Sequence, residues 1–76
     1  METIIKIIQS LRPAANIDEN TRLIDEKILD SLAMISLVAE LSDEFDVEIT
    51  AQDIIPENFE TVRAIYAMLE RLDDED

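Results

Sequence analysis

The chain has 76 residues, no cysteine and no histidine, and a formal net charge of -13 from 19 acidic and 6 basic residues. A domain of this size buries only about 60% of its unfolded surface, which leaves little depth for an enclosed substrate cavity. The lack of cysteine excludes a disulfide framework, a CxxC metal site and a thiol nucleophile. The excess of acidic residues opposes binding to nucleic acid or to an anionic membrane, so partners that bind by charge should be basic.

We predict a single domain over residues 1–76, in which residues 73–76 form an acidic flexible tail. No uninterrupted apolar run approaches the roughly 20 residues that a membrane span requires. The first residues, METIIKIIQSLRP, lack the basic start and the small-residue cleavage site of a signal peptide. We therefore expect a cytoplasmic monomer without a membrane span.

The first predicted element is a helix that ends before Pro13. Ile4, Ile8 and Leu11 recur at helical spacing within it. The segment that follows, residues 14–29, has no sustained period and many turn-forming residues. Apolar residues are nevertheless scattered through it, and we expect them to hold a long loop against the core: Ile17, Leu23, Ile24, Ile28 and Leu29.

A second helix is predicted over residues 30–45, with Asp30 or Ser31 as its N-cap. Its apolar face is unusually broad, so part of that face can stay exposed and serve as a contact surface for partners. The residues expected along this face are Leu32, Ile35, Val38 or Ala39, Leu41 and Phe45. After the helix, Val47 and Ile49 alternate over too few residues to predict a sheet, and we expect them to anchor a loop.

The last third of the chain predicts one short and one longer helix. Thr50 can cap a helical turn over residues 51–55, before Pro56. The final helix is predicted over residues 59–72, with Phe59, Val62, Ile65, Tyr66 and Leu69 facing inward. The fold class is therefore all-α, a bundle of three main helices and one short helix with a long first loop.

The motif Asp30-Ser31-Leu32 lies at the start of the second predicted helix. Free backbone N–H groups in the first turn of a helix favour an attached anion, so Ser31 is a candidate to carry a phosphate-linked group. Catalysis by Ser31 itself would need a nearby base, and the chain offers only carboxylates and two lysines. The plain alternative, that Ser31 only caps the helix, stays open on these residues alone.

Other chemistries have weaker support. The carboxylate pairs Asp43 with Glu44 and Asp25 with Glu26 are expected to lie on solvated surfaces, because acid–base catalysis needs a carboxylate with a perturbed pKa. An EF-hand calcium loop requires a glycine at its sharp turn, and the chain has no glycine. We therefore predict no metal site and no catalytic residue.

Four motifs in order resemble the acyl and peptidyl carrier proteins over nearly the whole chain: T-x-L at 21–23, DSL at 30–32, EFDVEI at 44–49 and NFETV at 58–62. The resemblance implies a four-helix carrier that is not an enzyme. It implies that Ser31 bears 4'-phosphopantetheine, transferred from coenzyme A by a phosphopantetheinyl transferase, and that the thiol of this arm holds acyl or aminoacyl groups as thioesters. Asp30 would cap the helix beside the site of the transferase, and Leu32 would hold the turn against the loop and contact partners.

The resemblance also implies partners: the transferase, a ligase that loads the acyl or aminoacyl group, and downstream synthase or transferase enzymes. The residues expected to contact them are Leu32, Ile35, Asp43 and Glu44. Ala33, Ser36 and Ser42 stand where fatty-acid carriers usually have acidic residues, which favours a polyketide, peptidyl or D-alanyl pathway. Two alternatives remain: an acidic helical module that binds a basic partner without phosphopantetheine, and a small carboxylate hydrolase, which size and the lack of histidine disfavour.

Overall fold

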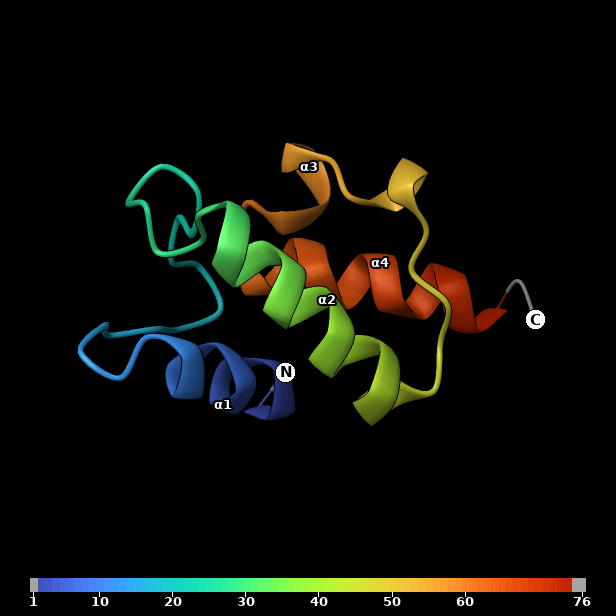
Figure 1. The fold of residues 1–76 in the computed structure, drawn as a ribbon, viewed down its shortest axis with the longest axis horizontal. Coiled ribbons are helices and arrows are strands. Elements are labelled where there is room, and N and C mark those ends of the chain that lie inside the picture. Colours follow the sequence, from blue (N-terminus) through green and yellow to red (C-terminus); the bar gives the residue numbers. More distant parts are fainter. Residues whose placement is uncertain (1, 75–76) are drawn as a thin grey trace.

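The computed structural model describes residues 2–74, and they contain helices and loops but no strand. The helical elements in chain order are α1 (Glu2–Leu11), α2 (Ser31–Phe45), the 3-10 helix η1 (Ala51–Asp53), α3 (Pro56–Phe59) and α4 (Val62–Asp74). In Figure 1 the long first loop lies at one end of the molecule, and α2 crosses in front of α4 with α1 beside them. The predicted all-α class is confirmed.

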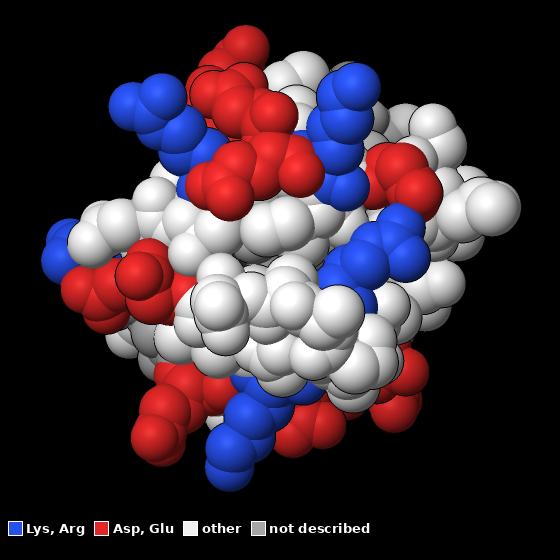
Figure 2. Space-filling view, turned by 90° about the vertical axis from the view of Figure 1, so that its left-hand side faces the viewer, with Lys and Arg blue, Asp and Glu red and all other residues white. Residues whose placement is uncertain are grey.

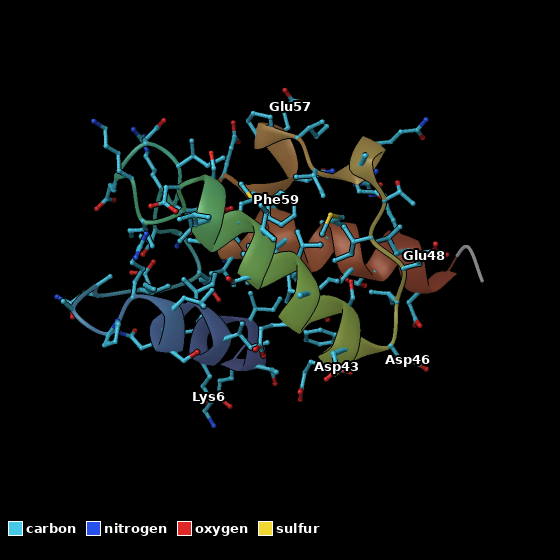
Figure 3. All side chains as sticks on the ribbon, viewed as in Figure 1. Lys6, Asp43, Asp46, Glu48, Glu57 and Phe59 are labelled. Carbon is cyan, nitrogen blue, oxygen red and sulfur yellow. The ribbon has the colours of Figure 1, made fainter. Side chains whose placement is uncertain are left out.

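The core takes residues from every α-helix and from the first loop. Phe59 of α3 is fully buried and points toward α2 and α4 (Figure 3). No charged or polar residue is buried in the part of the chain that the structure describes. The buried residues are Ile4, Ile8, Leu23, Ile28, Leu29, Ala33, Leu37, Leu41, Phe59, Val62, Ile65, Met68 and Leu69.

The first loop is held to this core as predicted. Leu23 is fully buried, its N–H donates to the carbonyl of Glu60 at 2.8 Å, and its carbonyl accepts from the N–H groups of Ile28 and Leu29 at 2.9 and 3.0 Å. Ile17 and Ile24 pack against the core from outside. These backbone hydrogen bonds fix the end of the loop that leads into α2.

The buried face of α2 differs from the prediction. Ala33, Leu37 and Leu41 form the buried row, whereas Leu32 and Ile35 are 78% and 68% exposed. The small side chain of Ala33 lets α1 pack closely against this row, which turns the neighbouring apolar row toward solvent. Leu32 therefore does not hold the turn against the loop, as the resemblance implied, while the expectation that part of the broad face stays exposed is confirmed.

The α2 helix ends at an unusual backbone position. Asp46 follows the helix with φ 53° and ψ 49°, a left-handed conformation, and its N–H donates to the carbonyl of Ser42. Glycine is the usual residue here because a Cβ atom is unfavourable in this region. Val47 and Ile49 then pack against the core, as predicted for loop anchors.

The last third of the chain agrees with the prediction in one place and departs from it in two. Residues 51–53 form the expected turn, and the N–H of Thr50 donates to the carboxylate of Asp53 at 3.1 Å. Phe59 belongs to a separate short helix, and α4 begins only at Val62 because the chain turns between them. Tyr66 is 40% exposed, and the buried position goes to Met68.

The helix α4 continues through Asp74, two residues beyond the predicted end. Residues 75–76 of the predicted acidic tail lie outside the described residues, so its flexibility stays a prediction. Within residues 2–74 no helix has the length and apolar character needed to cross a membrane.

Candidate functional site

Ser31 is the first residue of α2 and is exposed. The N-cap of α2 is Asp30, whose backbone is extended and whose Oδ1 atom accepts a hydrogen bond from the N–H of Ala33 at 2.9 Å. Over residues 2–74 the structure gives the hydroxyl of Ser31 no hydrogen bond. The interpretation of Ser31 as a plain capping residue is therefore wrong, and its hydroxyl is free for chemistry.

Asp30 has a second partner, Arg12, on the segment just after α1. The Nη2 atom of Arg12 donates to Oδ2 of Asp30 at 2.7 Å, and Nε of Arg12 donates to the carbonyl of Ile28 at 3.0 Å. The hydrogen bond from Ala33 lowers the pKa of Asp30 from its ordinary value; slight desolvation raises it, and the positive charge of Arg12 lowers it further. Asp30 is therefore ionised at neutral pH and held on two sides.

Ser31 opens onto an apolar groove between the start of α2 and the segment that joins η1 to α3. The groove has a volume of about 540 Å³ and is lined by Ile24, Leu29, Asp30, Ser31, Met34, Ile35, Ile54 and Pro56. Ile54 and Ile55 are 40% and 38% exposed. The sequence reasoning missed the contribution of Ile54 and Pro56 to this groove, although two consecutive isoleucines before a proline were a usable signal.

Leu32 and Ile35, predicted together as partner contacts, line different hollows. Ile35 lines the apolar groove with Ser31. Leu32 lines a separate hollow of about 270 Å³ near the end of α1, together with Leu11, Arg12, Asp30, Ala33 and Ser36. Leu32 and Ile35 are therefore neighbours in one exposed row of α2, but only Ile35 lines the groove that contains Ser31.

Asp43 and Glu44, the acidic residues predicted as partner contacts, lie at the other end of α2. Asp43 is about 18 Å from Ser31 along the helix axis, from the rise of about 1.5 Å per residue. Figure 3 shows Asp43 and Asp46 at the end of α2 and away from the first loop, with Glu48 on the segment that follows. Residues 31–39 carry no charged side chain. Apart from the carboxylate of Asp30, the groove beside Ser31 is thus apolar, and the acidic residues at the end of α2 are distant from it.

In the described part of the chain, no side chain is hydrogen-bonded to the hydroxyl of Ser31. Its neighbour Asp30 is an ionised carboxylate already bonded to Arg12 and Ala33, and the chain has no histidine. No cluster of metal-ligating side chains is found in the described part of the chain. Among residues 2–74, the structure therefore shows no base hydrogen-bonded to the hydroxyl of Ser31.

These features match a known class of protein. Residues 2–69 match the family model described as a phosphopantetheine attachment site, and the chain belongs to this family. Such proteins hold 4'-phosphopantetheine covalently and serve as carriers, so the chain is a carrier protein and not an enzyme. It interacts with a transferase and with synthetic enzymes.

Individual relatives agree with this assignment. The chain is 41% identical to the probable acyl carrier protein PigG of a Serratia species over 56 aligned residues. The aligned region covers 74% of this chain and 64% of PigG. It is 26% identical to the D-alanyl carrier protein of Listeria welshimeri over 73 aligned residues. The aligned region covers 93% of this chain and 94% of that protein. One chain in the crystal structure of an FAD-dependent dehydrogenase superposes with a TM-score of 0.79 at 37% identity, over 87% of this chain and 96% of that chain.

Proposed function

We propose that Ser31 is the residue to which 4'-phosphopantetheine is attached, and that the chain carries acyl or aminoacyl groups as thioesters on this arm. The observation that carries the proposal is the exposed hydroxyl of Ser31, which has no hydrogen bond because Asp30 caps the helix. The other serines are less suitable attachment sites. The hydroxyl of Ser10 donates to the carbonyl of Ile7 at 2.8 Å, and Ser36 and Ser42 lie beyond the first turn of α2.

The first turn of α2 suits the product of this reaction. In the transfer, a base of the transferase removes the proton of the Ser31 hydroxyl, and the oxygen attacks the phosphorus of coenzyme A that bears the pantetheine. A phosphodiester forms at Ser31, and 3',5'-adenosine bisphosphate leaves. The new negative charge lies beside free N–H groups at the start of α2, where the helix dipole favours an anion. The groove next to Ser31 gives the first part of the arm an apolar surface.

Intact-mass spectrometry after incubation with coenzyme A and a broad-specificity transferase tests the assignment. We expect a mass gain of one phosphopantetheine, lost in Ser31→Ala and kept in Ser36→Ala. Ser36 is the matched control because it is exposed on the same helix, one turn further on. The Ser31→Ala variant should keep the fold, since the hydroxyl makes no hydrogen bond. Modification that persists in Ser31→Ala would refute the assignment.

We propose that the chain serves a specialised pathway in which a flavoenzyme oxidises the carried group. We propose that this pathway operates in the cytoplasm. The support is the likeness to a chain in the crystal structure of an FAD-dependent dehydrogenase, together with the acyl and D-alanyl carriers among the relatives. A thioester acidifies the adjacent C–H group. A base of the flavoenzyme can therefore take a proton from the α-carbon while a hydride leaves the β-carbon for FAD, which yields an α,β-unsaturated thioester and FADH⁻.

Flavin absorbance reports this step directly. The carrier is loaded with a panel of saturated acyl and aminoacyl groups and mixed, without oxygen, with an FAD-dependent dehydrogenase of the kind in that crystal structure. We expect loss of the oxidised-flavin absorbance for at least one group, and a matching loss of two hydrogens in the mass of the carrier. The same groups on free pantetheine are the control. No flavin reduction with any loaded carrier would refute the proposed partner and leave the carrier role intact.

A further inference from the structure

Arg12 forms the side-chain link between the end of α1 and the residues that precede Ser31. Its N–H continues the helical pattern by donating to the carbonyl of Ile8 at 2.9 Å, so its backbone is fixed to α1. Its guanidinium then reaches across 18 positions in sequence to Asp30, at 2.7 Å, and donates to the carbonyl of Ile28 at 3.0 Å. One side chain thus joins α1, the end of the first loop and the cap of α2.

The two oxygens of the Asp30 carboxylate accept hydrogen bonds from two different residues. Its Oδ1 atom accepts from Ala33 inside the first turn of α2, and its Oδ2 atom is held by Arg12 outside the helix. With both oxygens engaged, the carboxylate has one orientation relative to α1. Because Asp30 is bonded to Ser31 through one peptide, this arrangement also fixes how the first residue of α2 faces the groove.

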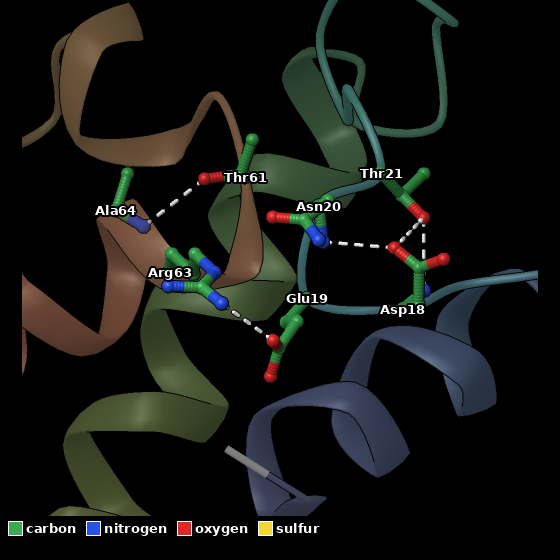
Figure 4. Close-up of polar contacts among 7 residues, drawn as sticks. All are labelled: Asp18, Glu19, Asn20, Thr21, Thr61, Arg63 and Ala64. Atoms are coloured by element: carbon green, nitrogen blue, oxygen red, sulfur yellow. Dashed lines mark hydrogen bonds and ion pairs between the residues drawn. The ribbon is translucent and has the colours of Figure 1, made fainter.

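A second ion pair provides a comparison within the same loop. Arg63 at the start of α4 donates to Glu19 at 2.7 Å (Figure 4), the same length as the pair of Arg12 with Asp30. Both pairs are partly exposed, and such surface pairs usually contribute little to stability. Only the Arg12 pair touches the residue next to Ser31. Figure 2 shows this end of the molecule, where side chains of both signs surround an uncharged band.

We propose that Arg12 is a positioning residue for the modification of Ser31, because it holds the Asp30 carboxylate and the Ile28 carbonyl in one arrangement and thereby sets the orientation in which a transferase meets the serine. The inference rests on the proposed attachment at Ser31. Arg12 does not touch the reacting atoms. It acts through Asp30 and the end of the loop.

The test compares transferase kinetics for the full chain and five variants at one pH, one of which carries two substitutions. Arg12→Gln removes the ion pair, and we expect its kcat/KM for modification to fall about tenfold, since small misplacement of a reacting group costs one to two orders of magnitude. Arg12→Lys keeps the charge but cannot donate to both the Asp30 carboxylate and the Ile28 carbonyl in the same geometry, so its rate should lie in between. Arg63→Gln removes the comparison pair and should stay within about twofold of the unmodified sequence.

A double-mutant cycle separates positioning from a loss of stability. Asp30→Asn keeps a good capping residue, and Arg12→Gln should slow the reaction of that variant much less than it slows the wild-type sequence, because both changes break the same link. Thermal melts of Arg12→Gln and Arg63→Gln should agree, so that a difference in rate cannot come from unfolding. In two-dimensional NMR, the amide signals of residues 29–32 should shift in Arg12→Gln and stay in place in Arg63→Gln.

Three results would overturn the inference while Ser31 is still modified: an unchanged rate for Arg12→Gln, an equal loss for Arg63→Gln, or additive effects of the Arg12 and Asp30 changes. If Arg12→Gln fails to fold, the comparison of Arg12→Lys with Arg63→Gln decides in the same way. Failure of the wild-type chain to be modified at Ser31 would refute the proposed function itself, and the inference with it.

Discussion

Ile35 provides a direct test of how partners recognise the loaded carrier. It lines the groove that opens beside Ser31 and is 68% exposed, so its truncation should hardly change the free energy of unfolding. The change Ile35→Ala removes three carbon atoms, worth roughly 2.4 kcal/mol when fully buried. Because about a third of the side chain is already covered, docking of a partner should bury the rest, and its loss should cost about 1.6 kcal/mol, or about fifteenfold in affinity.

For Asp43 we predict a different effect on transfer, one that depends on salt. It is exposed near the end of α2, and Asp43→Asn should mainly slow the association with a basic partner, by a few-fold at low salt and less at high salt. The effect of Ile35→Ala should be almost independent of salt, since residues 31–39 carry no charge. Steady-state transfer of the thioester-bound group to a cognate enzyme, at low and high salt, measures both.

Tyr66→Ala is the control for a general loss of exposed apolar surface. Tyr66 is 40% exposed on α4 and does not line the groove beside Ser31, so transfer should be nearly unchanged. A larger and salt-sensitive loss for Asp43→Asn than for Ile35→Ala would refute the reasoning, because it would mean that charge selects the partner. An equal loss for Tyr66→Ala would show that the groove is not special.

Three further predictions concern stability. Asp46→Gly should raise the melting temperature by about 4–8 °C, equivalent to about 1 kcal/mol. The substitution relieves the left-handed backbone and removes a negative charge from the C-terminus of α2. Asp46→Asn removes only the charge, so an equal gain in that variant would contradict the backbone contribution. The folded pKa of Asp30 is lowered from 3.8, so its contribution to stability is present above pH 3.8 and is lost as the pH falls through the lower folded pKa. The difference in urea midpoint between the wild-type sequence and Asp30→Asn should therefore shrink below about pH 4, and a difference that stays constant down to pH 2 would be inconsistent with the shift. Finally, the net charge of -13 should make the melting temperature rise from low to moderate salt, and calorimetry that finds no rise would count against self-repulsion.

The positions of α1 and α2 could be predicted from the sequence, but the rotation of α2 could not. Periodicity and Pro13 define α1 because its apolar residues gather on one side of the helix and its polar residues on the other. In α2, residues 31–39 are all uncharged, so the row of Leu32 and Ile35 and the row of Ala33 and Leu37 are equally plausible inward faces. Packing against α1 decides between them, and that contact joins segments far apart in sequence.

The candidate site was predictable only where it depends on local sequence patterns. The motif at residues 30–32 places a serine at the start of a helix, which the structure confirms. The choice of Asp30 over Ser31 as the cap depends on side-chain geometry, since both residue types are good caps. The pair of Arg12 with Asp30 and the contribution of Ile54 depend on the path of long connections, which local patterns do not specify.

The assignment of the cap to Asp30 has a consequence for the life cycle of the carrier. The residue on which α2 depends and the residue proposed for attachment are neighbours, but they are different residues, so folding and labelling are separate events. A newly made chain can be fully folded before it meets the transferase. Removal of the arm by a hydrolase should likewise return a folded chain that can be labelled again without refolding. The geometry therefore predicts that the unlabelled chain is stable on its own and that labelling at Ser31 leaves the cap of α2 intact.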